Sequence, residues 1–538
     1  MGFNTVIFSL VVLVVMTSEI PGQVLYSLTA PNPRFEAAFG WSVSGAGDVN
    51  NDGRADIIVG ETRGGGNTGR AYVYSGADGN LLYSLESPNP QSLGFFGASV
   101  SGAGDVNADG YDDLIVGAED EDDGLLNAGR AYVFSGEDGS LISALSSPNP
   151  EDDGRFGFSV SGAGDVDANG HHDVIVGAPK EDGNSANSGR AYVFTGSGEI
   201  LYTFASSNQN PSDEFGNSVS GIGDVNGDGF SDVIVGAHME WADTTEAGKA
   251  YVFSGDGGGL FYSLQSPNSQ YRGYFGNSVS GAGDVNNDGN PDIIVGAHQE
   301  DFGDDAAGAV YVFEGASGAQ IATLVSPNPE SGGFFGISLS GVGDVNHDMC
   351  DDFIVGSQES GVVDRSGRAY IFSGAGGLLY TLVSPNPEPW GWFGYSVSGA
   401  GSVNMDGQPD IIIGAPMEKA QYDLSGRAYV ITPGGVSTDN IPPVRSTNLL
   451  IDGPYPNPSN GDALIQLGIS DGGAETVRLT LHDVAGRIVM GPWCMRLYGG
   501  NDLLSVNLEA DGDIGPGTYL LRLTASGKSA GKTMVILR

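Results

Sequence analysis

The stretch FGASVSGAGDVNADGYDDLIVGAEDEDDGLLNAGRAYVFSGEDGSLISALSSPNP, residues 96–150, contains the pattern that decides the fold. Its apolar segments are short, rich in Val, Ile, Tyr and Phe, and bounded by Gly, Asn, Asp or Pro. That combination is the signature of β-strands joined by turns. Four such segments follow one another with short connections, so the stretch predicts a four-stranded antiparallel meander.

The same pattern occurs seven times along the chain. One sheet of about 60 residues cannot bury both of its faces alone, so the units must pack on one another. Radial packing of four-stranded sheets is a β-propeller. The Phe-Gly dipeptide marks each copy and recurs every 57 to 60 residues, at Phe39, Phe96, Phe156, Phe215, Phe275, Phe335 and Phe393.

A propeller must also join its two ends, because an open array would leave unpaired strand edges. The segment LYSLTAPNP, Leu25–Pro33, precedes the first Phe-Gly and matches the fourth-strand segments of the other copies. After the last third-strand segment, which ends at Ile431, no fourth-strand sequence follows. The sequence therefore predicts an all-β chain with a seven-bladed β-propeller closed by an N-terminal strand.

An acidic turn joins the first and second strands of each copy, beginning with Asp48-Val-Asn50-Asn-Asp52-Gly53-Arg-Ala-Asp56. Oxygen-bearing side chains at positions 1, 3, 5 and 9, a Gly at 6 and a carbonyl at 7 suit Ca²⁺, and suit the stricter octahedron of Mg²⁺ less well. Without a cation, the clustered carboxylates would repel one another. The predicted ligands are Asp48, Asn50, Asp52, Asp56, Asp105, Asn107, Asp109, Asp113, Asp165, Asp167, Asn169, Asp173, Asp224, Asn226, Asp228, Asp232, Asp284, Asn286, Asp288, Asp292, Asp344, Asn346, Asp348, Asp352, Asn404, Asp406 and Asp410.

The alternative for these segments is an Asx-rich hairpin turn that binds no metal. Recurrence of one frame in seven copies favours the cation. Two copies differ from the others. The sixth carries Met349 in place of Gly, so a left-handed backbone there would be strained. The seventh has Ser402 in place of the first Asp, and we expect that turn to bind a cation weakly or to stay empty.

Composition and charge exclude several function classes. The 538 residues include 88 Gly and 26 Pro, too many for a helical protein. The 22 basic and 67 acidic residues give a net charge of −45, which excludes nucleic acid and anionic lipid as partners unless cations bridge them. The two cysteines, Cys350 and Cys494, lie far apart and cannot form a disulfide framework or a cysteine-based zinc cluster.

Apolar patterning divides the chain into four parts. The apolar run Val6–Met16 is shorter than the ~20 residues that span a bilayer, so we interpret residues 1–22 as a signal peptide; the alternative is a buried first strand. No other stretch approaches membrane length, and we expect a soluble, exported chain without a transmembrane segment. Residues 23–436 form the propeller, 437–448 a polar linker and 449–538 a small β-sandwich.

Three motifs recur in order in the propeller: Phe-Gly, the Asp-x-Asn-x-Asp-Gly-x-x-Asp turn, and Val-Gly-Ala-Pro, intact at Val176–Pro179. In combination they resemble the FG-GAP repeats of integrin α-subunit propellers over about residues 24–436. The resemblance implies extracellular recognition, with calcium stiffening the loops of one face. It does not carry over a choice of ligand.

The C-terminal part carries its own motifs: Tyr455-Pro-Asn-Pro458, the turn from Leu481 to Arg487, Gly517-Thr-Tyr519 and the ending at Arg538. Together they are similar to the C-terminal sorting domain of type IX secretion cargo in Bacteroidota-like bacteria. The resemblance implies the type IX secretion machinery as a partner, with the protein secreted or held at the bacterial cell surface. An Ig-like accessory domain is the alternative.

Candidate ligand loops lie opposite the acidic turns, because successive turns of a meander alternate between its two ends. The loops between the second and third strands and those leading into Phe-Gly vary most, and variable loops on a rigid scaffold usually carry function. Their aromatic rings offer flat surfaces to sugars or protein side chains, unless they pack between blades. The candidate ligand-binding residues are Trp241, Tyr271, Tyr274, Trp390 and Trp392.

Catalytic signatures are weak. The sequence has no nucleophile elbow, P-loop or HExxH motif, and His238 and His298 occupy the slot of Pro179, which favours a structural role. The sequence thus predicts a secreted or cell-surface, calcium-binding, non-enzymatic propeller for adhesion to, or recognition of, an extracellular protein or glycan. The alternative is an extracellular polysaccharide-acting lyase or hydrolase built on the same propeller.

Overall fold

The computed structural model describes the propeller over residues 23–242, 246–374 and 376–433, and the backbone of five strands between residues 449 and 536. The predicted signal peptide, residues 1–22, and the predicted linker, residues 437–448, lie outside the described residues. None of the helices in the described part is long and apolar enough to cross a membrane.

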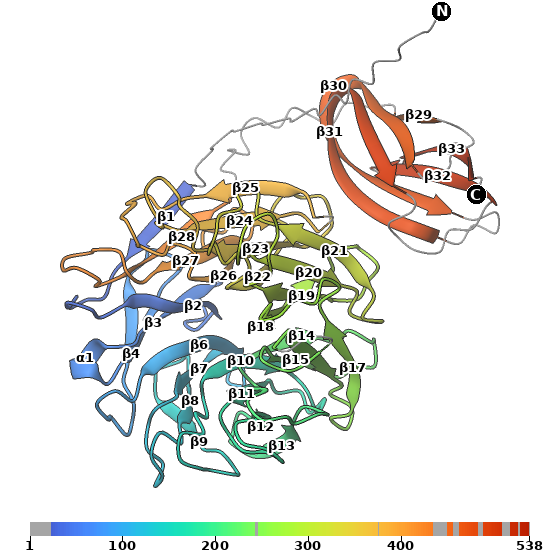
Figure 1. The fold of residues 1–538 in the computed structure, drawn as a ribbon. Helices are drawn as coiled ribbons and strands as arrows, with labels where there is room; N and C mark the ends of the chain where they lie inside the picture. Colours follow the sequence, from blue (N-terminus) through green and yellow to red (C-terminus); the bar gives the residue numbers. More distant parts are fainter. Residues whose placement is uncertain are drawn as a thin grey trace, which may run out of the picture.

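Seven four-stranded antiparallel sheets surround one axis, with the first strand of each innermost (Figure 1). The innermost strands contact one another around a closed ring. The blades are, in order, β2 (Phe39–Gly47), β3 (Asp56–Glu61), β4 (Arg70–Tyr74) and β5 (Leu81–Leu85); β6 (Phe96–Gly104), β7 (Asp113–Ala118), β8 (Arg130–Phe134) and β9 (Leu141–Leu145); β10 (Ser159–Gly164), β11 (Asp173–Ala178), β12 (Arg190–Thr195) and β13 (Ile200–Phe204); β14 (Ser218–Gly223), β15 (Asp232–Ala237), β16 (Lys249–Phe253) and β17 (Leu260–Gln265); β18 (Phe275–Gly283), β19 (Asp292–Ala297), β20 (Ala309–Phe313) and β21 (Gln320–Val325); β22 (Leu339–Gly343), β23 (Asp352–Ser357), β24 (Arg368–Phe372) and β25 (Leu378–Leu382); and β26 (Ser396–Gly401), β27 (Asp410–Ala415), β28 (Arg427–Thr432) and β1 (Gln23–Leu28).

The ring closes as the sequence predicts. Strand β1 pairs antiparallel with β28, with Ser27 opposite Tyr429, so the seventh sheet has the order β1-β28-β27-β26. The last blade is therefore built from both ends of the propeller, which confirms the seven-bladed all-β fold. A single helical turn, α1 (Gly64–Asn67), lies in the loop between β3 and β4.

Burial explains why each strand has its sequence. The second strands, such as β7, are buried along their whole length because both of their faces pack against neighbouring blades, which requires continuous apolar runs. The outer strands, such as β9, are mostly exposed or half-buried, and in β9 only the last residue, Leu145, is fully buried. The core therefore consists of apolar layers between adjacent blades rather than one central mass.

The Phe-Gly motif holds adjacent blades together. Phe96 is fully buried, and Gly97 has a φ of 85° in the left-handed region that glycine favours. A Cβ on Gly97 would lie 2.3 Å from the carbonyl oxygen of Arg70 in the preceding blade, and one on Gly117 would lie 2.0 Å from that of Gly157 in the next. These glycines are required because backbone meets backbone there.

The C-terminal part is also all-β. Its strands are β29 (Leu449–Tyr455), β30 (Asp462–His482), β31 (Ile488–Asn507), β32 (Gly517–Ala525) and β33 (Lys528–Ile536). Hydrogen bonding joins them in one sheet of order β29-β30-β32-β33, with β31 on the other edge of β30. Strand β29 also contacts β33, so the two ends of the sheet come together.

Candidate functional site

The two ends of the blades carry different chemistry. In blade 1, the Gly76 N–H in the turn between the third and fourth strands donates to Asp56 Oδ1 at 2.8 Å, so this turn lies beside the acidic turn. At the opposite end, the Asp122 N–H donates to Gln91 Oε1 at 2.8 Å, which joins a second-to-third-strand loop to the loop leading into Phe-Gly. The acidic turns and the variable loops thus lie at opposite ends of the blades, as expected.

The acidic turn of blade 1 is tightly organised by its own carboxylates. Asp48 accepts hydrogen bonds from the N–H groups of Asp52, at 3.0 Å, and Gly53, at 2.8 Å. Asn51 and Gly53 both have left-handed backbones, with φ of 54° and 86°. The backbone of the turn therefore curls around the carboxylate oxygen atoms of its first residue, which hold it through hydrogen bonds without a cation.

Unsatisfied oxygen atoms in these turns test whether a cation fits. Asn50 Oδ1 is buried and has no hydrogen-bond partner. In blade 3, the carboxylates of Asp165, Asp167 and Asp173 each offer an oxygen, and these atoms lie within 4.8 Å of one another. Asp173 Oδ1 is likewise buried without a partner. Converging hard oxygen donors of this kind fit a divalent cation such as Ca²⁺.

The ninth position of the turn is a buried carboxylate in every blade. In blade 1, the oxygens of Asp56 accept N–H groups from Val49 and Gly76, which tie it to two turns. Burial, and then the charges of the other aspartates in the turn, raise the pKa of these groups, because ionisation is unfavourable there without a cation. The pKa values are about 6 for Asp56, Asp113 and Asp232, about 7 for Asp173, and about 8 for Asp292 and Asp352; that of Asp410 is also raised.

The two divergent turns keep the same backbone path. Met349 has a φ of 69°, which confirms the predicted left-handed backbone at this position. Its side chain is 65% exposed, and its N–H donates to Asp344 Oδ2 at 2.8 Å. The next residue, Cys350, is buried and disulfide-bonded, which corrects the expectation that the two distant cysteines offer no disulfide, because separation along the chain does not fix distance in the fold. In the seventh turn Ser402 supplies no carboxylate, and the Asn404 side-chain amide donates to Asp406 Oδ2 at 3.0 Å.

The opposite end of each blade contains a repeated buried acid that the sequence interpretation missed. Each of these glutamates is at most 1% exposed and accepts a hydrogen bond from a tyrosine hydroxyl. The signal was present, because the two residues are eleven positions apart in every copy. The pairs are Glu61 and Tyr72, Glu121 and Tyr132, Glu181 and Tyr192, Glu240 and Tyr251, Glu300 and Tyr311, Glu359 and Tyr370, and Glu418 and Tyr429.

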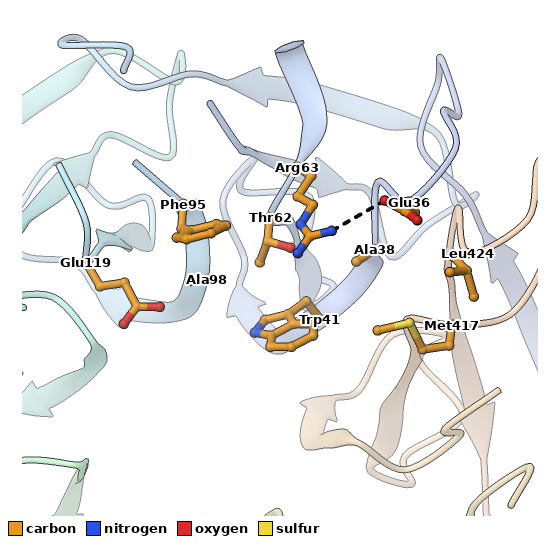
Figure 2. Close-up of a pocket in the computed structure, with 10 residues that line it drawn as sticks. All are labelled: Glu36, Ala38, Trp41, Thr62, Arg63, Phe95, Ala98, Glu119, Met417 and Leu424. Carbon is orange, nitrogen blue, oxygen red and sulfur yellow. Dashed lines mark ion pairs between the residues drawn. The ribbon is translucent and has the colours of Figure 1, made fainter. Parts of the chain in front are cut away.

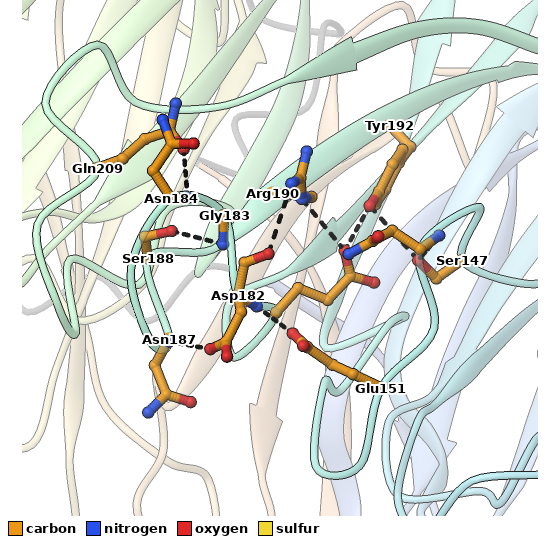
Figure 3. Close-up of polar contacts among 12 residues, drawn as sticks. Ser147, Glu151, Asp182, Gly183, Asn184, Asn187, Ser188, Arg190, Tyr192 and Gln209 are labelled. Carbon is orange, nitrogen blue, oxygen red and sulfur yellow. Dashed lines mark hydrogen bonds and ion pairs between the residues drawn. The ribbon is translucent and has the colours of Figure 1, made fainter.

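These pairs lie at the base of the variable loops, and Figure 3 shows polar contacts of the loop of blade 3, including those of Tyr192, Asp182 and Asn184. The Tyr192 hydroxyl donates to Glu181, and the following residue, Asp182, accepts the Asn187 N–H at 2.7 Å. The Asn184 N–H donates to Gln209 Oε1 at 2.8 Å in the next loop. Because the loop bonds both to itself and to its neighbour, its conformation is set before any ligand arrives.

The five predicted ligand-binding aromatics fall into two groups. Trp241, Tyr271 and Trp390 are 57%, 63% and 52% exposed, whereas Tyr274 and Trp392 are half-buried. Trp241, Tyr271 and Tyr274 belong to the loops that follow β15 and β17, and Trp390 and Trp392 to the loop that follows β25. The rings are therefore distributed over the variable-loop end rather than gathered in one site.

Tyr274 packs between two histidines. Its ring centroid lies 5.3 Å from that of His238 and 5.8 Å from that of His298. Burial lowers the pKa of His238 to about 3, aided by the charges of His298 and Lys180, and burial lowers that of His298 to about 4. Both imidazoles are therefore neutral at pH 7, consistent with the structural role expected from the sequence.

A cavity of about 350 Å³ opens at the variable-loop end, where blades 7, 1 and 2 meet. Figure 2 shows Trp41 between Phe95 and Glu119 on one side and Met417 and Leu424 on the other. None of the five predicted aromatics lines this cavity. Sequence reasoning missed it because its walls come from three copies of the repeat.

The fold and its two differently equipped ends define a β-propeller built from seven copies of one repeat. Six segments match the FG-GAP repeat: residues 39–74, 96–134, 156–194, 215–253, 275–313 and 393–431. Blade 6 is outside these segments although it has the same four strands; it carries Met349 and, in β23, Ser357 at the position of Ala118.

Curated relatives with similar sequences are integrin α-subunits. Integrin alpha-5 of Xenopus laevis is 34% identical over 216 residues, which are 38% of this chain and 20% of that protein. Integrin alpha-4 of Xenopus laevis is 30% identical over 240 residues (43% and 22%), and integrin alpha-2 of Bos taurus is 34% identical over 182 residues (32% and 15%). The chain thus spans about a fifth of the length of these relatives and carries an integrin α-like propeller of FG-GAP repeats.

Among solved structures, the Dos1 propeller aligns with a TM-score of 0.41 and 10% sequence identity, covering 76% of this chain and 88% of that one.

Proposed function

We propose that this protein is a secreted or surface-displayed, non-enzymatic recognition propeller that mediates adhesion to an extracellular protein or glycan. One observation carries the proposal. The variable loops are fixed by the buried glutamate–tyrosine pairs at one end of the blades, where exposed rings such as Trp241 and Trp390 stand ready to contact a ligand. Rigid loops bearing exposed aromatic side chains suit binding, because little conformational entropy is lost when the ligand docks.

Calcium has a stabilising role in this proposal. The acidic turns lie at the other end of the blades, and each includes a buried aspartate, such as Asp113, that bonds to two turns of its blade. A Ca²⁺ ion held by the first, third, fifth and ninth positions would neutralise these carboxylates and stiffen the scaffold beneath the loops. The ligand itself would not contact the ion.

Export completes the proposal. Residues 1–22 would direct the chain to the bacterial cell envelope as a signal peptide, and residues 449–538 would serve as a type IX sorting domain behind the linker 437–448. Truncation before Leu449 should then leave a folded propeller in the periplasm, because residues 449–538 contribute no strand to the seven blades. Delivery of the truncated chain to the cell surface would contradict the sorting role.

Printed arrays of extracellular proteins and glycans, probed with the full chain, test recognition, and an activity screen on the same glycans tests the hydrolase or lyase alternative. Replacing Trp390 and Trp392 together by Ala should weaken binding by more than 1 kcal/mol without changing calcium uptake. Phe261→Ala, on the outer strand β17, is the matched control. Turnover of a bound glycan would overturn the non-enzymatic assignment, and unchanged affinity in the double variant would exclude that loop as the contact surface.

A further inference from the structure

The cavity between blades 7, 1 and 2 has walls that are joined by contacts between the blades. Trp41 belongs to β2, directly after Phe39 and Gly40, and its indole packs against Tyr395 of blade 7 with ring centroids 4.8 Å apart. The Ala38 N–H donates to the Leu424 carbonyl at 3.2 Å, which joins the loops of blades 1 and 7 at the cavity wall. The cavity is therefore a built feature of the closed ring and not a gap between mobile loops.

Its lining combines aromatic rings with paired charges. Trp41 and Phe95 are half-buried, so each presents part of its ring to the cavity. The carboxylate of Glu36 lies 3.6 Å from the Arg63 guanidinium, and that of Glu119 lies 3.6 Å from Arg155. At 3.6 Å these ion pairs are too long to be direct hydrogen bonds, so the N–H donors and carboxylate acceptors keep capacity for a ligand.

The balance of charge decides which ligand fits. Glu36 faces Arg63, whereas Glu119 shares Arg155 with Asp120, whose carboxylate is nearer to it at 3.4 Å. Burial, and then the charge of Asp120, raise the pKa of Glu119 to about 7, so little uncompensated negative charge is left at the cavity to attract a cationic side chain. A purely apolar ligand would shield Glu119 and Arg63 from water and leave them only these long ion pairs and no hydrogen bond from the ligand, at a cost in free energy. A neutral polyhydroxylated ligand satisfies both requirements, because its hydroxyls donate to the carboxylates and accept from the guanidinium while its C–H face stacks on an aromatic ring.

We propose that this cavity binds a neutral sugar at the end of a glycan, with Trp41 as the stacking platform. The proposal rests on the recognition function proposed above and names its ligand class. A volume of about 350 Å³ falls at the small end of the ~300–1,000 Å³ typical of ligand pockets, which suits one end of a glycan rather than a polymer lying along the surface. Thr62 and Arg63 on blade 1 and Glu119 on blade 2 supply the polar contacts.

The test uses the full chain. The neutral probes are methyl glycosides of the common hexoses and N-acetylhexosamines, and the cationic probes are Nα-acetyl-lysine amide and Nα-acetyl-arginine amide, whose side chains stay charged. Binding is followed by saturation-transfer NMR and calorimetry. At least one neutral glycoside should bind saturably and neither cationic probe should. Trp41→Ala should reduce that affinity at least tenfold, and Trp41→Phe should retain more of it. Glu119→Gln should reduce that affinity about threefold, because a neutral amide oxygen accepts a ligand hydroxyl more weakly than a carboxylate does.

Variants are compared only if their melting temperatures match the parent, and Phe261→Ala is the control for loss of a distant ring. If Trp41→Ala unfolds, Thr62→Val at the same wall, nearly equal in volume, replaces it with the same expectation of weaker binding. The proposal is overturned if Trp41→Ala leaves glycoside binding unchanged. It is also overturned if a cationic probe binds the parent and Glu119→Gln abolishes that binding. If the arrays identify a protein ligand but no glycoside binds, the sugar-binding proposal is wrong and the recognition function is retained. If neither a protein nor a glycoside binds, both proposals are wrong.

Discussion

Asp112 of blade 2 accepts a hydrogen bond from the backbone N–H of Asp48 in blade 1, with 2.8 Å between the nitrogen and Oδ2. The Asp112 N–H in turn donates to the Asp48 carbonyl at 3.3 Å. Asp48 is the first predicted ligand of its acidic turn, so the cation turn of one blade rests on the next. Asp351 and Asp284 repeat this contact between blades 6 and 5, at 2.9 Å.

Replacing Asp112 by Ala should lower both the stability of the propeller and the calcium affinity of the blade 1 turn. The variant leaves the Asp48 N–H without its charged acceptor, which costs about 1–3 kcal/mol. Thermal unfolding with and without calcium measures the effect. Ser231→Ala is the control, because Ser231 holds the same position in blade 4 and contacts Asp165 through its backbone alone. Equal melting temperatures for the two variants would show that the Asp112 carboxylate does not support the turn.

Chelation should destabilise the propeller, because an ion that binds only the folded turns adds its binding free energy to stability. We expect calorimetry to find about five calcium sites, from the five turns with Asp first and Gly at position 6, in blades 1 to 5. Asp228→Ala should remove one site, whereas Asp256→Ala, exposed at the same end of the same blade, should remove none. A melting temperature that responds to neither calcium nor chelator would refute the cation assignment.

Deleting Gln23–Pro33 should open the ring. The deletion removes β1, the partner of β28, and leaves a long unpaired edge that favours aggregation. Light scattering and thermal unfolding compare the deletion with a chain beginning at Gln23. A monomeric deletion variant that unfolds as cooperatively as its control would mean that β1 is dispensable for closure.

Stability should fall as pH rises from about 4.5 to 7 because of Glu181. Burial raises its pKa to about 7, aided by the charge of Glu151 and opposed by hydrogen bonds from Ser147 and Tyr192. In this window the unfolded glutamate has lost its proton while the folded one retains it, so the folded state binds more protons and loses stability as pH increases. The shift corresponds to about 3 kcal/mol across the window.

Glu181→Gln should remove this part of the pH dependence, since the amide cannot ionise. Chemical unfolding at pH 5 and pH 8, with calcium saturating, measures the difference between parent and variant. The exposed Glu137→Gln is the control and should keep the dependence of the parent. An identical pH profile for Glu181→Gln and the parent would show that Glu181 ionises as readily in the folded chain as in the unfolded one.

Much of the fold was predictable because it depends on local patterns that are repeated. Each strand, such as β7, is marked by its own apolar residues, and the leftover segment Leu25–Pro33 identified the partner of β28 by counting alone. The acidic turns were equally visible, since their oxygen-bearing residues lie within nine positions of one another. Met349 could even be placed in the left-handed region, because the other six copies have glycine there.

The sequence by itself thus determined the seven blades, their closure, and which end of each blade carries the acidic turn. Strand and turn propensities act over a few residues, and the same pattern of residues occurs in all seven copies. Only the tertiary structure decided that Asp112 supports Asp48, that Glu181 pairs with Tyr192 in the interior, and that Trp41 and Glu119 line one cavity. Those contacts depend on how far neighbouring blades are rotated and separated, and that geometry arises from the packing of the whole ring.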